Sequence, residues 1–210
     1  MSYIKDPMAI EQKSFEIIQG IIDEISPGYQ FKNEVEEKII KRAIHTTADF
    51  DYLEILKISE TAVASIKDAL LNGATIYTDT NMALSGINKN RLKALGVEVK
   101  CYVSDERVAA LAKEKEMTRS MAAVEYAATK PGRKLFVLGN APTALYKVME
   151  LHEEGKLQVD AVVGVPVGFV GAAESKDALE ATDIPYILSK GRKGGSNLAA
   201  AIINAIVYSF

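Results

Sequence analysis

The chain has 210 residues, of which 48% are apolar and 25% are charged. These values are ordinary for a globular protein and exclude a disordered or fibrous chain. The formal net charge of −3 argues against a surface that binds nucleic acid or an anionic membrane over its whole extent. One cysteine excludes an internal disulfide framework, and two histidines leave too few ligands for a Cys/His zinc site.

The sequence carries no recognisable targeting or membrane signal. Its first residues lack the basic and then apolar stretch of a secretory signal. The most apolar late segment, residues 198–207, is much shorter than the roughly 20 residues that cross a membrane. We therefore expect a cytoplasmic protein without a membrane partner.

Two helices are predicted in the first 50 residues. Asp6 and Pro7 form a cap followed by a proline at the first helical position, and apolar residues then recur with helical spacing until Pro27. Residues 33–36 have the pattern of a capping box. The helix that they open is expected to run to about Thr47.

From residue 59 onward, helical and strand-like segments alternate. Strands are predicted at 74–78, 97–103, 134–139, 161–165 and 185–189. Helices are predicted at 60–72, 88–95, 105–116, 118–129, 142–154, 171–181 and 195–208. Because helices separate the strands, we expect one α/β domain over residues 1–210. Its sheet should be mostly parallel and five-stranded, flanked by helices in a doubly wound, Rossmann-like arrangement.

Glycine-rich turns follow the late strands. Eight of the 14 glycines lie in the last 72 residues, mostly where strands end. In an open parallel sheet ligands bind at this edge, and glycine lets backbone N–H groups approach an anion. For any single turn, the need for a tight strand-to-helix connection explains the glycines as well as anion binding does. None of the turns matches the dinucleotide fingerprint or the P-loop spacing, so no nucleotide cofactor is indicated.

The two histidines have different surroundings. His152 lies at a polar helix end and needs no role beyond solvation. His45 shares a helix face with Arg42, and also with Asp49 if the helix extends that far. An imidazole between a cation and a carboxylate is suited to general acid–base work. A surface histidine in an ion-pair cluster is the alternative interpretation.

Arg119 and Cys101 are two further residues with more than one interpretation. Arg119 begins a predicted helix between Thr118 and Ser120, where its guanidinium could clamp a carboxylate, although an exposed arginine in a first turn is commoner. Cys101 lies inside a predicted strand and is expected to be a small core side chain.

The last predicted helix, residues 195–208, is apolar almost all round. It must therefore be buried in the core or against a second subunit, which favours a dimer.

Six motifs occur in one characteristic order along nearly the whole chain. They are residues 44–49, 77–82, 118–120, 139–145, 166–176 and 191–196. In this order the chain resembles the precorrin-8X methylmutase family and its anaerobic counterpart, cobalt-precorrin-8 methylmutase. The blocks 140–145 (Asn-Ala-Pro-Thr-Ala-Leu) and 166–176 (Pro-Val-Gly-Phe-Val-Gly-Ala-Ala-Glu-Ser-Lys) are long enough to be highly specific.

The resemblance implies an isomerase of cobalamin (vitamin B12) biosynthesis. Such enzymes move a methyl group from carbon 11 to carbon 12 of a corrin precursor. The product is hydrogenobyrinic acid, or cobyrinic acid when cobalt is already present. The family is α/β and homodimeric, with its site near the subunit interface. It uses no separate cofactor, although the substrate itself can carry cobalt.

The resemblance also implies a set of site residues. The catalytic histidine of the family corresponds to His45, for which we predict the role of general acid. The tetrapyrrole substrate carries many carboxylates. Residues predicted to bind it are Ser14, Arg42, Asp79, Thr118, Arg119, Asn140, Lys176 and Arg192, with Lys13 and Lys193 as further candidates. Asp79 could instead orient His45.

Two other functions remain open from sequence. A non-enzymatic corrinoid carrier would have the same basic, glycine-lined pocket but would need no acid at His45. A nucleotide-dependent enzyme would use the same kind of sheet, and the missing fingerprint disfavours it.

Overall fold

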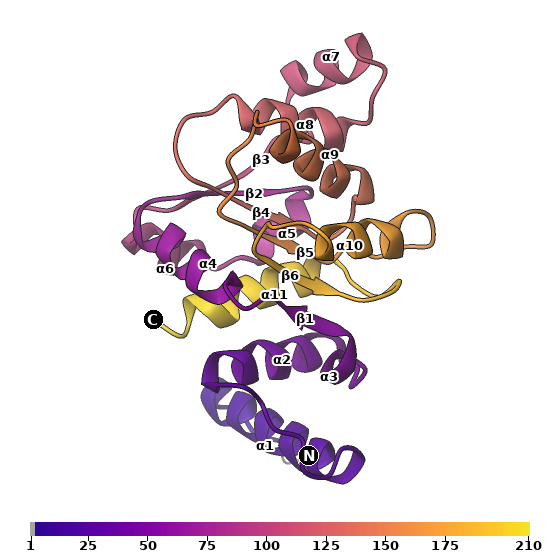
Figure 1. Cartoon of the computed structure of the whole chain (residues 1–210). Helices are drawn as coiled ribbons and strands as arrows, with labels where there is room; N and C mark the ends of the chain where they lie inside the picture. The colour runs from indigo at the N-terminus through magenta and orange to yellow at the C-terminus, as the bar shows by residue number, and fades with distance from the viewer. Residues whose placement is uncertain (1–2) are drawn as a thin grey trace.

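A six-stranded sheet forms the centre of the molecule (Figure 1). The structure is a computed structural model and describes residues 3–210. The strands are β1 (Leu56–Ile58), β2 (Thr75–Thr78), β3 (Glu98–Cys101), β4 (Lys134–Leu138), β5 (Ala161–Gly164) and β6 (Tyr186–Ser189). Their order is β1-β6-β5-β4-β2-β3, and every pair is parallel except β1 with β6.

The five predicted strands are confirmed, and the count of five is corrected to six. The missed strand, β1, has only three residues, Leu56, Lys57 and Ile58. So short a segment shows no readable alternation, and its pairing with β6 fixes it as a strand.

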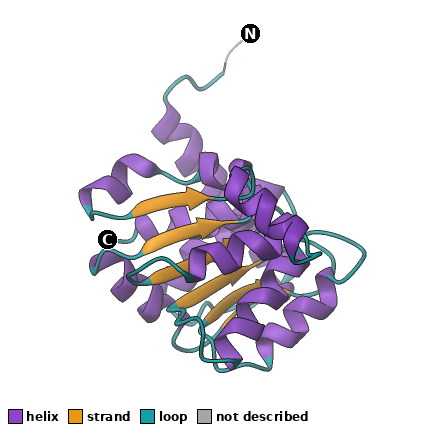
Figure 2. Ribbon diagram, turned by 90° about the horizontal axis from the view of Figure 1, so that it is seen from above, coloured by secondary structure: helices purple, strands orange, loops and turns teal. Residues whose placement is uncertain are grey.

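Helices cover both faces of the sheet (Figure 2), as the doubly wound prediction requires. They are α1 (Pro7–Ile25), α2 (Glu34–Thr47), α3 (Tyr52–Ile55), α4 (Ala62–Leu71), α5 (Asn81–Gly86), α6 (Lys89–Ala94), α7 (Glu106–Glu114), α8 (Arg119–Ala128), α9 (Pro142–Glu153), α10 (Ala172–Glu180) and α11 (Ser196–Val207). All nine predicted helices are present. The short α3 and α5 were not predicted.

Successive residues of the central strands pack on opposite faces. Val137 and Val163 belong to a core with α2, α4 and α11, whereas Phe136 and Val162 belong to a core with α8, α9 and α10. Each strand is therefore buried on both sides, which explains why its sequence is a continuous apolar run.

Helix α11 is buried inside this chain. It packs between α2 and the sheet, and its apolar residues from Leu198 to Val207 are all buried. The sequence left open whether a second subunit covers this helix, and the structure shows that its own neighbours do. The apolar character of α11 therefore gives no argument for a dimer.

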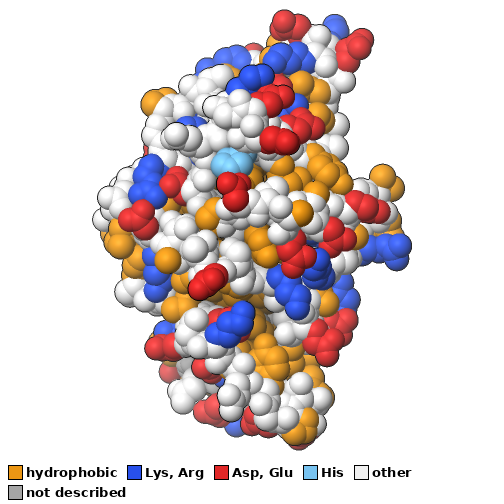
Figure 3. Space-filling model, viewed as in Figure 1, with side chains coloured by type: hydrophobic (Ala, Val, Ile, Leu, Met, Phe, Trp, Pro, Cys, Tyr) orange, Lys and Arg blue, Asp and Glu red, His pale blue; other side chains and the backbone are white. Residues whose placement is uncertain are grey.

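Helix α1 packs mainly on α2 and stands away from the sheet (Figure 1). The Asp6 carboxylate caps it by accepting from the N–H of Met8, as the sequence predicted. Ile10, Ile17 and Ile25 on this helix are 45%, 52% and 55% exposed. Hydrophobic side chains are visible on the surface of this part of the molecule, at the bottom of Figure 3.

None of the helices in residues 3–210 combines the length and the apolar character that a membrane-spanning helix requires.

Gly139, directly after β4, is expected to tolerate no side chain. A Cβ there would lie 2.7 Å from backbone atoms of Gly195 and Ser196. Gly139→Ala should therefore lower the free energy of unfolding by about 1–3 kcal/mol, measured by urea denaturation. Gly20→Ala in α1 is the control, because nothing lies within 4 Å of its added Cβ. This variant should gain about 0.5–1 kcal/mol from helix propensity, and equal effects of the two substitutions would contradict the packing argument.

Candidate active site

Asp79 stands at the point where the direction of chain winding changes. It follows β2, whose neighbours β3 and β4 lie on its two sides. Ligands of doubly wound sheets bind at such a point, outside the carboxyl ends of the strands. The Asp79 side chain is nevertheless buried, with 5% exposure.

Both oxygens of Asp79 bind the backbone of the next loop. Oδ1 accepts from the N–H of Gly139 at 3.0 Å, and Oδ2 accepts from the N–H groups of Asn140 and Ala141 at 2.7 and 2.6 Å. Burial raises the pKa of the Asp79 carboxyl, while these three donors act in the opposite direction. Asp79 therefore braces the β4–α9 loop, and its predicted contact with substrate or with His45 stays a prediction.

Two further loops pack tightly beside this one. They are the β5–α10 loop (residues 165–171) and the β6–α11 loop (residues 190–195). The N–H of Gly168 donates to the carbonyl of Arg192 at 3.1 Å, and the N–H of Gly195 donates to the carbonyl of Val165 at 2.9 Å. A Cβ on Gly194 would lie 2.1 Å from that Val165 oxygen. Close packing between loops is therefore sufficient reason for glycine at this position.

Lys176 lies beneath the same two loops. Its side chain has 0% exposure, and its Nζ donates to the carbonyls of Pro166 at 3.1 Å and Lys193 at 2.9 Å. The Ser189 hydroxyl is 3.5 Å away. Burial lowers the pKa of the Lys176 ammonium to about 8. In this structure the Lys176 ammonium binds the backbone of these loops and is closed off from solvent, so the prediction that it meets a substrate carboxylate gains no support from the geometry.

His45 is exposed in the last turn of α2. Its ring lies edge-on to the ring of Phe15, with 5.4 Å between centroids. The helix ends at Thr47, and Ala48 is left-handed at φ 54°. The chain therefore turns away before Asp49, so the expectation that Asp49 flanks His45 on the helix face is wrong.

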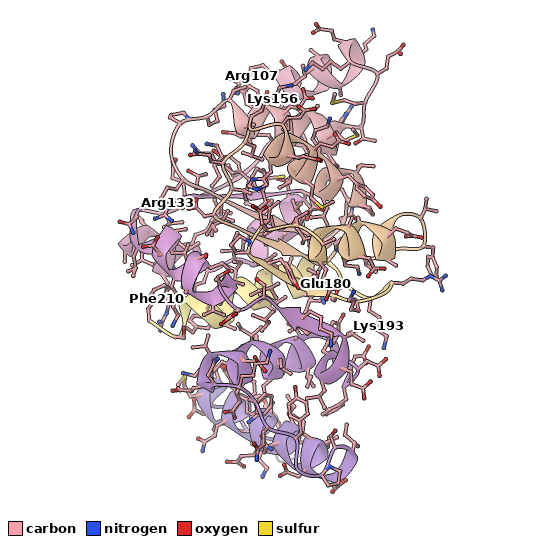
Figure 4. All side chains as sticks on the ribbon, viewed as in Figure 1. Arg107, Arg133, Lys156, Glu180, Lys193 and Phe210 are labelled. Carbon is pink, nitrogen blue, oxygen red and sulfur yellow. The ribbon has the colours of Figure 1, made fainter. Side chains whose placement is uncertain are left out.

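Asp49 instead joins α2 to the carboxyl edge of the sheet. The Lys193 ammonium binds the carboxylates of Asp49 and Asp51, each at 2.5 Å. In Figure 4 the Lys193 side chain extends from its loop toward the segment between α2 and α3. The hydrogen bond from Lys193 lowers the pKa of the Asp49 carboxyl. This ion pair ties the segment that follows α2 to the β6–α11 loop, and it occupies Lys193.

Arg42 and Ser14 lie at the junction of α1 and α2. The Arg42 guanidinium is 4.9 Å from the ring centroid of Phe15 and 5.7 Å from that of Tyr208, and it pairs with Glu11. The Ser14 hydroxyl donates to a backbone carbonyl one turn earlier, at 2.8 Å. Phe15, which was not among the predicted site residues, thus contacts both His45 and Arg42. Its only signal in the sequence is a place on the apolar face of the first predicted helix, and such a face is equally typical of core packing. A groove of about 440 Å³ runs past Phe15 and Arg42.

Thr118 and Arg119 begin α8. The Thr118 hydroxyl accepts from the N–H of Met121 at 3.2 Å and lies 3.1 Å from the hydroxyl of Thr143. Two of the sequence motifs, 118–120 and 139–145, therefore adjoin in space. The Arg119 side chain is exposed.

Asn140 and Arg192 are also exposed on their loops. The Arg192 guanidinium lies 5.7 Å from the ring centroid of Phe169. Phe169 and Val170 are 84% and 91% exposed. Both belong to the motif 166–176, for which no role of these two side chains was predicted. The only sequence signal for their exposure is that they are two apolar residues between Gly168 and Gly171, just after a strand.

Comparison with known proteins identifies the family. Residues 9–209 match the family model described as precorrin-8X methylmutase. The chain is 54% identical to cobalt-precorrin-8 methylmutase of Salmonella typhimurium (strain LT2), over 99% of this chain and 98% of the relative. It is 37% identical to precorrin-8X methylmutase of Pseudomonas aeruginosa, over 98% and 97%. A solved structure of precorrin-8x methyl mutase from Thermus thermophilus has a TM-score of 0.84 at 36% identity, covering 96% of this chain and 95% of that one.

The chain therefore belongs to the precorrin-8X methylmutase family. That family consists of isomerases of cobalamin biosynthesis, so the predicted family, fold class and enzyme class are all supported. Neither the corrinoid carrier nor the nucleotide-dependent enzyme receives support from these comparisons.

Asp79→Asn is expected to destabilise the protein by about 2–4 kcal/mol, because an amide cannot accept from three N–H groups as a carboxylate does. Urea denaturation measures this change, and amide hydrogen exchange at 139–141 should rise with it. Asp105→Asn is the control. Asp105 caps α7 at the end of β3, and asparagine caps a helix about equally well. Unchanged stability and exchange in Asp79→Asn would contradict the bracing role.

Proposed function

We propose that this protein moves a methyl group from carbon 11 to carbon 12 of cobalt-precorrin-8, giving cobyrinic acid. The observation that carries the proposal is the 54% identity to a cobalt-precorrin-8 methylmutase over nearly the whole of both chains. That relative also favours the cobalt-containing substrate over metal-free precorrin-8, whose product would be hydrogenobyrinic acid. The proposed working unit is one methylmutase-type α/β domain over residues 1–210, acting in the cytoplasm.

The reaction is an intramolecular 1,5-sigmatropic shift. The bond from the methyl carbon to carbon 11 breaks while its bond to carbon 12 forms, within one molecule. No electron is gained or lost, so the protein needs neither a nucleophile nor a redox partner, and we propose that it uses no separate cofactor. His45 donates a proton to a ring nitrogen, which withdraws electrons from the conjugated system, and takes the proton back from the product.

The exposed cations and amides at the carboxyl edge are proposed to bind the substrate's carboxylates. Asn140 and Arg192 extend from two loops at that edge, and Arg119 begins α8, whose cap residue Thr118 lies beside Thr143. Ser14 and Arg42 lie near His45 on the α1–α2 layer. Guanidinium groups suit this task because they bind carboxylates bidentately.

A homodimer completes the proposal. His45 and the exposed apolar side chains of α1 belong to the same α1–α2 layer, which stands away from the sheet. Exposed apolar surface of this kind favours association with a second copy.

The proposed reaction is tested by incubating the purified protein with cobalt-precorrin-8 and with metal-free precorrin-8 in separate reactions. Migration of the methyl group changes the conjugation of the ring, so turnover appears as a change in the visible spectrum. We expect turnover of the cobalt form. Turnover of the metal-free form alone would move the enzyme to the aerobic pathway, and no change with either would defeat the proposal.

His45→Ala should lower the rate of this reaction by about 10²–10⁴-fold while leaving corrinoid binding nearly intact, because general acid catalysis is typically of that size. Spectral turnover assays and product-binding titrations measure the two effects separately. The control is His152→Ala, since His152 lies at the end of α9 and contacts Asp183. Normal turnover in His45→Ala would remove the acid role.

Ile17→Glu should convert a dimer to a monomer, because it places a charge on the exposed apolar side of α1. Sedimentation or light scattering gives the mass. Leu71→Glu is the matched control, since Leu71 is 61% exposed at the end of α4. A wild-type protein that is monomeric at micromolar concentration would contradict the dimer.

A further inference from the structure

Lys176 is a buried cation that the proposed chemistry does not use. It lies on α10 with 0% exposure, and the partners of its Nζ are two backbone carbonyls, of Pro166 and Lys193, and the Ser189 hydroxyl. Backbone carbonyls are neutral, so they leave the positive charge uncompensated. Burying a lysine in this way is costly and rare.

The charged side chains of α10 and of the β6–α11 loop are engaged elsewhere or face solvent, and of these Asp177 still attracts the Lys176 ammonium without pairing with it. On its own helix, Asp177 and Glu180 pair with Lys190, and Glu174 is exposed. On the β6–α11 loop, Lys193 pairs with Asp49 and Asp51, and Arg192 is exposed. Strand β5 and residues 165–171 contain no titratable side chain. Within residues 3–210, Lys176 makes no ion pair.

The two carbonyls that Lys176 holds belong to different loops. Pro166 is buried directly before the exposed part of the β5–α10 loop, and Lys193 lies in the middle of the β6–α11 loop. The same loops are joined by the hydrogen bonds from Gly168 to Arg192 and from Gly195 to Val165. Arg192, a proposed carboxylate ligand, is thus one residue from a backbone group that depends on Lys176.

We propose that Lys176 is a positioning residue whose positive charge locks the β5–α10 and β6–α11 loops in the arrangement that binds the substrate's carboxylates. The ammonium donates to both loops at once, and no neutral apolar side chain can do so. The identity of the ligand in this proposal rests on the proposed function. The role of Lys176 in holding the two loops rests only on its hydrogen bonds.

The hydrogen bonds from Lys176 to the two loops should weaken as the pH rises. Burial lowers the pKa of Lys176 to about 8, whereas a lysine in water titrates near 10.4. A neutral amine donates weaker hydrogen bonds, so the fraction of protein with ordered loops falls as the pH passes through 8. An apparent dissociation constant rises in inverse proportion to the competent fraction. The affinity for a polycarboxylate corrinoid should therefore weaken between pH 7 and pH 9, by up to about tenfold if the neutral form leaves the loops unlocked.

Lys134 provides a matched control. It is also a buried lysine, with 6% exposure, and its Nζ donates to the carbonyl of Gly132 at 2.8 Å. Burial lowers the pKa of Lys134 as well. It begins β4 and therefore lies at the amino edge of the sheet, away from the carboxyl edge. A general effect of neutralising a buried lysine should appear equally in Lys134→Met.

The first measurement needs no ligand. Amide hydrogen exchange at Gly168 and Gly195 reports the two hydrogen bonds between the loops. In Lys176→Met, exchange at both amides should rise at least about tenfold at pH 7, while the amides held by Asp79 at 139–141 keep their protection. Wild-type protection at Gly168 and Gly195 in a folded Lys176→Met protein would overturn the proposal, whatever the enzyme's substrate is.

The second measurement follows the dissociation constant of cobyrinic acid from pH 7 to pH 9. Binding by wild type and Lys134→Met should weaken by up to about tenfold across this range. Lys176→Met should bind at least about tenfold more weakly at pH 7 and show no further fall. Lys176→Arg keeps the charge at every pH, so it should lose the pH dependence while keeping most of the affinity.

The outcomes separate the two proposals. If the wild-type protein does not bind cobyrinic acid at any pH, the proposed function fails and hydrogen exchange alone decides the role of Lys176. If Lys176→Met binds like wild type and retains its pH profile, the positioning role fails while the proposed function stands. Thermal unfolding of each variant verifies that it is folded, and Lys176→Arg tests the charge if Lys176→Met does not fold.

Discussion

The need to satisfy buried backbone groups where three loops meet shapes the carboxyl edge of this sheet. The loops after β4, β5 and β6 approach so closely that glycine is required at Gly139 and Gly194. Two buried side chains of opposite charge, Asp79 and Lys176, provide hydrogen-bond partners for backbone groups of these loops. Asp79 accepts from backbone N–H groups of one loop, and Lys176 donates to carbonyls of the other two. Each charge is matched to backbone groups of the opposite polarity, and a buried charge is tolerated only where such bonds exist.

The exposed residues of the proposed site depend on this arrangement. Asn140 and Arg192 extend from the braced loops, and the Lys193 ion pair with Asp49 ties the segment after α2 to the β6–α11 loop. The proposed methyl shift, with His45 as the predicted acid, requires from the protein only orientation and one proton. A rigid platform of backbone with a single imidazole is sufficient for that purpose. The overall charge of −3 is compatible with a polyanionic ligand because the cations that meet it are local.

Much of the fold could be predicted from periodicity and caps. The five longer strands and the nine longer helices were predicted because each has a readable repeat or a boundary signal, such as Asp6 before α1. Strand β1 and helices α3 and α5 were missed because three to six residues contain too little pattern. The site was predicted less well. Residue type indicated that Asp79 and Lys176 bind something, but not whether the partner is a ligand or the protein's own backbone.

The sequence by itself determined the α/β class and the family. Alternation of helices and strands and the long motifs are local properties of the chain. Only the tertiary structure decided which charged residues face solvent and which lie beneath the loops. Lys176 and Arg192 are both basic residues in glycine-rich motifs, yet one is fully buried and the other is exposed. Burial is set by elements far apart in sequence that pack over a residue, and no local pattern encodes that packing.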